Sequence, residues 1–134
     1  IRPLVECPEA FGRTRDLTLG LGSYWDTYPV IFASGDRIIV RTIDGTKSVR
    51  HWANDLEWYA PRADGRLFTF IIMSDEWPDR DALGAEFGTP AERLDCRSLG
   101  PGYGDRVIWA YDRPGAGHLT AVIDQRYIEL RAGR

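Results

Sequence analysis

LTLGLGSYWDTYPV, residues 17–30, is the segment that decides the fold. Its first residues alternate weakly between apolar and small or polar side chains, which predicts a short strand. Ser23 is a favourable N-cap and Asp26 follows three residues later, so a helix is predicted to begin there. Gly20 and Gly22 fall between this predicted strand and helix. A strand, a glycine turn and a helix in that order are typical of an α/β domain.

The remaining sequence continues this alternation of strands and helices. β-branched or apolar runs predict strands, and apolar residues at helical spacing predict helices. The predicted elements are a strand over 17–21, a helix over 24–34, a strand over 37–43, a helix over 49–59, a strand over 67–73, a helix over 78–87, and strands over 92–97 and 107–111, followed by an extended tail over 118–130. This order predicts an α/β fold, a small Rossmann-like three-layer domain with a mostly parallel sheet.

Length and charge limit the classes of function. The chain has 134 residues, which predicts a single domain over 1–134, and its net charge is only -3. Arginines and acidic residues are interspersed, so a nucleic-acid partner is not expected. No apolar run reaches the roughly 18 residues of a membrane span. Because the sequence begins with Ile1, we expect a piece of a longer protein or a processed chain.

The two cysteines are Cys7 and Cys96, and the two histidines are His51 and His118. These four residues are too scattered for a structural zinc site, and neither a metal nor another cofactor is predicted. Each cysteine is either a small buried apolar residue or one half of a Cys7–Cys96 disulfide. A disulfide would indicate an oxidising compartment.

The glycine turn has two readings. Gly20 and Gly22 match the first two glycines of a dinucleotide-binding turn, and Asp44 lies about where a ribose-binding acid would follow. However, Trp25 occupies the third glycine position. The carboxylate of Asp26 would also repel a phosphate at the helix start. We therefore predict a structural turn, with a nucleotide- or dinucleotide-binding enzyme domain as the alternative.

GLGSYWDTY, residues 20–28, and FASGDRIIV, residues 32–40, together resemble the soluble C-terminal region of bacterial multispanning membrane proteins. These proteins are glycosyltransferase-like, of the polyprenyl-phosphate-sugar class, and their catalytic carboxylates are expected in the membrane part. The resemblance implies an accessory domain on the extracytoplasmic face of a bacterial membrane. Its partner would be the membrane-embedded part of the same chain, and no catalytic residue is carried over.

Acidic and aromatic residues supply the candidate ligand contacts. Asp75 and Glu76 follow the most apolar predicted strand, where carboxylates bind a metal ion or sugar hydroxyls or simply cap a helix. His51 and Trp52 suit an anionic sugar phosphate, although the pattern favours a helix surface with one buried indole. The candidate ligand-binding residues are Trp25, Asp44, His51, Trp52, Asp75 and Glu76.

The leading functional hypothesis is therefore a noncatalytic extracytoplasmic accessory domain of a membrane glycosyltransferase-like protein. It would support recognition of a glycan or a lipid-linked donor, or contact another protein. The nucleotide-binding domain is one alternative, and a purely structural interaction module is another.

Overall fold

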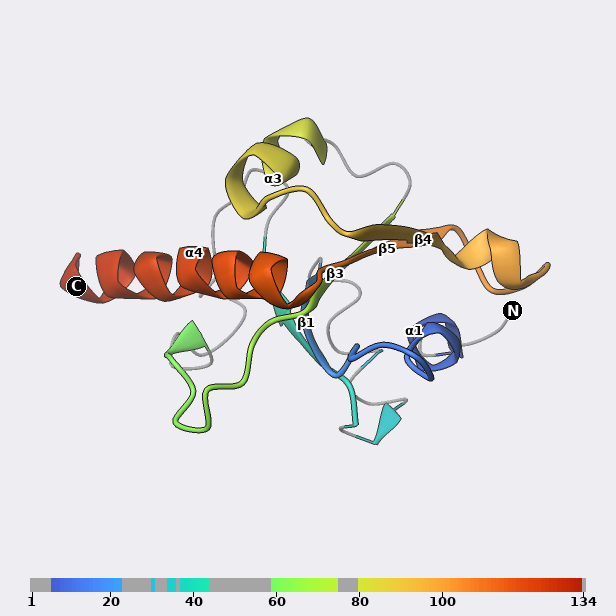
Figure 1. Cartoon of the computed structure of the whole chain (residues 1–134), viewed down its shortest axis with the longest axis horizontal. Coiled ribbons are helices and arrows are strands. Elements are labelled where there is room, and N and C mark those ends of the chain that lie inside the picture. The colour runs from blue at the N-terminus through green and yellow to red at the C-terminus, as the bar shows by residue number, and fades with distance from the viewer. Residues whose placement is uncertain are drawn as a thin grey trace.

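The computed structural model describes residues 6–22, 30, 34–35, 37–43, 59–74 and 80–133. Within these residues the fold is mixed α/β, with helices packed around one five-stranded sheet (Figure 1). The elements are α1 (Glu6–Phe11), β1 (Leu19–Gly22), β2 (Ile39–Thr42), β3 (Phe70–Ser74), α3 (Arg80–Phe87), β4 (Glu92–Asp95), the 3-10 helix η2 (Cys96–Leu99), β5 (Arg106–Ala110) and α4 (Arg113–Ala132). The predicted α/β class is confirmed.

The sheet has the strand order β2-β1-β3-β5-β4. β1 pairs in parallel with both β2 and β3, so Gly22 lies beside Thr42 on one side and Ile72 on the other. β5 is antiparallel to both of its neighbours, β3 and β4. Four of the five described strands therefore run in one direction, and β5 alone runs against them. The sheet is mostly parallel, as predicted, with one reversed strand inserted between β3 and β4.

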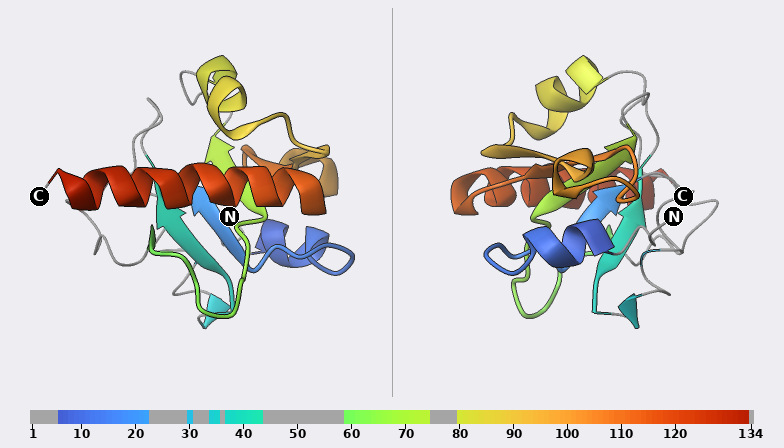
Figure 2. Two further views of the ribbon diagram at one scale, coloured as in Figure 1. Left: turned by 60° about the vertical axis from the view of Figure 1, so that its left-hand side comes forward. Right: turned by 90° about the vertical axis from the view of Figure 1, so that its right-hand side faces the viewer.

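The C-terminal tail is a helix, and the prediction of an extended tail over 118–130 was wrong. α4 is 20 residues long and crosses the sheet before it continues beyond it (Figures 1 and 2). Asp112 caps it by accepting a 2.9 Å hydrogen bond from the backbone N–H of Gly115. Two glycines and several β-branched residues lower its intrinsic helix propensity. Burial against the sheet outweighs that weak local preference.

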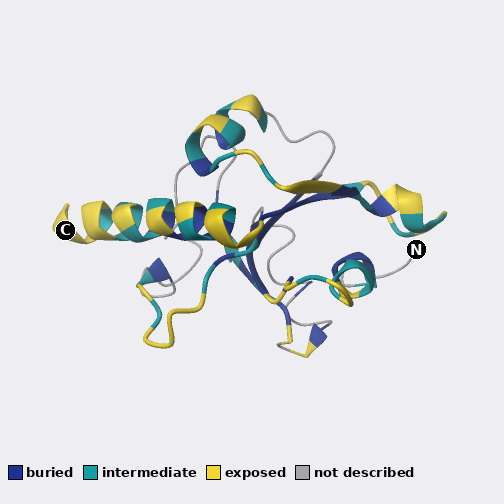
Figure 3. Ribbon diagram, in the orientation of Figure 1, coloured by how far each residue is buried: buried dark blue, intermediate teal, exposed yellow. Residues whose placement is uncertain are grey.

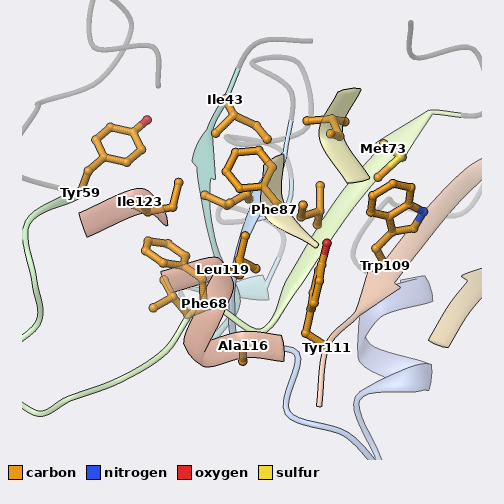
Figure 4. Packing of buried hydrophobic residues seen from close by; sticks show 14 of the residues in the cluster. Ile43, Tyr59, Phe68, Met73, Phe87, Trp109, Tyr111, Ala116, Leu119 and Ile123 are labelled. Atoms are coloured by element: carbon orange, nitrogen blue, oxygen red, sulfur yellow. The ribbon is translucent and has the colours of Figure 1, made fainter. Parts of the chain in front are cut away.

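Both faces of the sheet bury apolar side chains, because neighbouring strand residues point to opposite sides. On one face, α3 and α4 cover a cluster that includes Ile71, Trp109 and Leu119 (Figure 4). On the other face, a second cluster includes Phe70 and Ile108. Figure 3 shows the buried strands at the centre, with the exposed positions on the outer sides of the helices.

Gly20 and Gly22 lie inside β1, which corrects their assignment to a glycine turn after the strand, although Gly20 does fall within the strand predicted over 17–21. Both belong to the face of the sheet that buries Phe70. A Cβ atom on Gly20 would lie 2.5 Å from Cζ of Phe70, and one on Gly22 would lie 2.9 Å from Cγ1 of Val40. The two glycines are therefore required by the packing of larger side chains from the neighbouring strands β3 and β2.

Cys7 and Cys96 form a disulfide, so the second of the two cysteine readings is correct. Both residues are buried, in α1 and at the start of η2. The bond therefore joins the first described helix to the end of the edge strand β4. α1 has only six residues, of which Cys7 and Pro8 are buried, so its noncovalent contact with the core is small. The disulfide fixes this short helix against the sheet.

Candidate functional site

The carboxyl ends of β1, β2 and β3 lie side by side at one edge of the sheet. This is the edge at which α/β proteins usually bind ligands. The buried Tyr59 packs beneath it, and its hydroxyl donates a 2.6 Å hydrogen bond to the carbonyl of Thr42, at the end of β2. The described part of this edge is thus well anchored.

The ligand-binding residues that the sequence suggests lie outside the described residues. They are Trp25, Asp44, His51, Trp52, Asp75 and Glu76. Asp44 comes two residues after the last residue of β2, and Asp75 directly follows β3. The positions of these side chains are not described, so their roles in ligand binding stay predictions.

A cleft of about 530 Å³ opens at the opposite edge of the sheet, where β5 ends and α4 begins. Its apolar lining includes Leu17, Leu67 and the ring of Tyr111. Three arginines and three acidic residues complete the lining: Arg15, Arg66, Arg113, Asp16, Glu92 and Asp112. Such a volume is typical of a small-molecule site.

Sequence reasoning missed this cleft. Its lining comes from short stretches near residues 16, 66, 92 and 112, which are far apart in the chain. None of these stretches carries a recognisable motif. The parallel pairing of β1 with β3 places the first two stretches side by side, and the reversed strand β5 adds the stretches near residues 92 and 112.

One wall of the cleft is held by an ion pair between Arg15 and Glu92. The guanidinium donates from Nε to Oε1 at 2.8 Å and from Nη2 to Oε2 at 2.7 Å. These hydrogen bonds hold the pKa of the Glu92 carboxyl below its usual value. The pair joins the segment after α1 to the start of β4, across 77 residues of sequence. It therefore positions the wall and occupies one acceptor site on each carboxylate oxygen of Glu92.

Tyr111 forms part of the floor and points its hydroxyl into the core between the sheet and α3 (Figure 4). The hydroxyl donates a 2.8 Å hydrogen bond to the carbonyl of Gly88, just after α3. Desolvation by burial raises the pKa of Tyr111 well above its ordinary value of 10.0. The folded protein therefore keeps this phenol protonated.

This shift predicts a loss of stability at alkaline pH. Tyr111 contributes stability that is full below the unfolded pKa of 10.0. That stability is lost as the pH rises from there toward the higher folded pKa, because the unfolded phenol ionises first. Tyr111→Phe should cost about 1 kcal/mol at pH 8, through the missing hydrogen bond. The variant should also show a shallower decline in stability above pH 10. Urea unfolding across this pH range measures both effects, and identical slopes for the two proteins would contradict the prediction.

Among the described residues, no three metal-ligating side chains cluster, and no helix is long and apolar enough to cross a membrane. The described residues do form the cleft above, which has charged side chains of both signs and an apolar lining. Comparison with known proteins found no matching family model, curated protein or solved structure.

Proposed function

We propose that the chain is an extracytoplasmic accessory domain of a bacterial membrane glycosyltransferase-like protein. It would carry no catalytic residue of its own and would support recognition of a glycan or lipid-linked sugar donor beside the membrane-embedded part of the same chain. We also infer the finer arrangement expected from the sequence, a small Rossmann-like domain of three layers. The two apolar clusters, one on each face of the sheet, support that arrangement.

The observation that carries the location is the buried disulfide between Cys7 and Cys96. Disulfides form and persist in oxidising compartments and are rare in the cytosol. The chain has only these two cysteines, and they pair with each other.

The placement of Gly20 and Gly22 favours an accessory role over the nucleotide-binding alternative. In a dinucleotide fold the glycines lie in the turn, where the backbone approaches the pyrophosphate. Here both lie within β1 and make room for Phe70 and Val40. Their presence is thus explained by packing alone. The third alternative, a purely structural interaction module, predicts the same packing but no small-molecule binding.

The proposed extracytoplasmic location of the chain is tested by labelling an introduced cysteine in intact cells. Ala63 is exposed in the turn before β3, so Ala63→Cys should leave the fold unchanged. In cells that produce the full gene product, a small sulfonated maleimide, which does not cross the cytoplasmic membrane, should label this cysteine fully before lysis. The unsubstituted protein, with its cysteines bonded, is the control. Labelling only after lysis would refute the proposed location.

The accessory role is tested separately, by measuring sugar transfer in membranes from cells that produce the full gene product. Sugar transfer from a polyprenyl-phosphate donor should need the membrane-embedded part and should fall when the 134 residues are deleted. Full transfer without them would refute a role in donor recognition.

A further inference from the structure

The direction of β5 places a second strand-to-helix junction at the other edge of the sheet. Because β5 is antiparallel to β3 and β4, its carboxyl end lies beside the amino ends of those strands. α4 begins there, and the cleft of about 530 Å³ opens at the same point. Ligands of α/β proteins bind outside the carboxyl ends of strands that lead into helices. Applied to β5, which leads into α4, that rule indicates this cleft as a ligand-binding site.

The acidic residues of the cleft already have donors within the chain. Asp16 accepts from the hydroxyl of Thr18 at 2.6 Å and from its backbone N–H at 3.2 Å. Both carboxylate oxygens of Glu92 accept from Arg15. Asp112 accepts from the backbone N–H of Gly115 in the first turn of α4, so that helix start is already capped.

Two arginine side chains of the cleft differ from these acidic residues in their hydrogen bonding. Arg66 and Arg113 are exposed, and neither guanidinium has a hydrogen-bond or ion-pair partner within the part of the chain that the structure describes. A guanidinium presents a planar set of donors that matches the oxygens of a phosphate or carboxylate. The N–H donors of these two guanidinium groups are therefore available to bind an anion. Beside them, Leu17 and Leu67 form an apolar floor.

We propose that this cleft binds a sugar phosphate, with Arg66 and Arg113 donating to the phosphoryl oxygens and the sugar lying over the apolar floor. The anionic group follows from the unpaired arginines. The choice of a sugar as the attached group rests on the proposed function. The three arginines and three acidic residues of the lining give it no net formal charge. Recognition therefore depends on directed hydrogen bonds from the two guanidinium groups rather than on the net charge of the cleft.

Titration of the purified chain tests the proposal. Glucose 1-phosphate and inorganic phosphate are the soluble probes, followed by amide NMR shifts. Vesicles with and without a polyprenyl-phosphate sugar are the lipid probe, followed by sedimentation. Arg66→Gln and Arg113→Gln should each weaken binding roughly tenfold, as expected for the loss of a charge-assisted hydrogen bond. Arg13→Gln is the matched control, because Arg13 is an exposed arginine outside the cleft.

Each outcome decides the proposal. Binding of glucose 1-phosphate that both cleft variants weaken and Arg13→Gln does not would support it. Binding of the vesicles with the same variant pattern would support it with a lipid headgroup as the source. No binding of any sugar phosphate at millimolar concentration, or equal binding by all variants, would overturn it. The maleimide labelling of Ala63→Cys is independent of these titrations, so failure of the cleft and failure of the proposed location are distinguishable.

Discussion

Gly20→Ala is expected to destabilise the protein by about 3 kcal/mol, at the upper end of the range for overpacked cores. The new Cβ would lie 2.5 to 2.6 Å from three ring atoms of Phe70, which is fully buried in the adjacent strand β3. The ring belongs to a packed cluster that offers it no free space. Urea unfolding of the two proteins measures the loss.

Two further variants make this result specific. Gly117→Ala is the matched control, because Gly117 lies in α4 and a Cβ there would meet no atom within 4 Å. It should stabilise the helix by roughly 0.5–1 kcal/mol. Phe70→Leu combined with Gly20→Ala should be less destabilised than the sum of the single variants, because the smaller side chain relieves the overlap. A neutral Gly20→Ala would contradict the packing role of this glycine.

Loss of the Cys7–Cys96 disulfide should have the largest effect of any change described. The bond closes a loop with a sequence separation of 89. In the chain-entropy model, a crosslink over such a loop is worth about 4–5 kcal/mol, which is a large part of the stability of one small domain. The variant with both Cys7→Ala and Cys96→Ala should therefore unfold at much lower denaturant concentration than the oxidised protein.

Reduction of the unsubstituted protein is the control for that variant. It removes the crosslink and keeps both buried side chains, so similar losses in the two experiments would assign the effect to the crosslink. A loss below about 1 kcal/mol in both would show that the denatured chain gains little freedom when the bond is broken.

The sequence by itself determined the class of the fold and the approximate places of most strands. Hydrophobic periodicity is a local property, so the apolar runs around Ile39, Ile71 and Ile108 identify strands without knowledge of their neighbours. The cysteine count left two readings open. Pairing needs Cys7 and Cys96 to be close in space, which only the folded chain establishes.

The tertiary structure decided the features that depend on contacts between distant segments. Leu119 and Ile123 lie on the face of α4 that the sheet covers. Their burial stabilises a helix in the C-terminal segment, whose intrinsic helix propensity is weak. Gly20 reads as a turn residue until Phe70 is placed beside it. The cleft between β5 and α4 exists only because β5 enters the sheet against its neighbours. The alternation of strands and helices predicted a mostly parallel sheet, but the strand order and the reversed direction of β5 depend on how the whole sheet is buried.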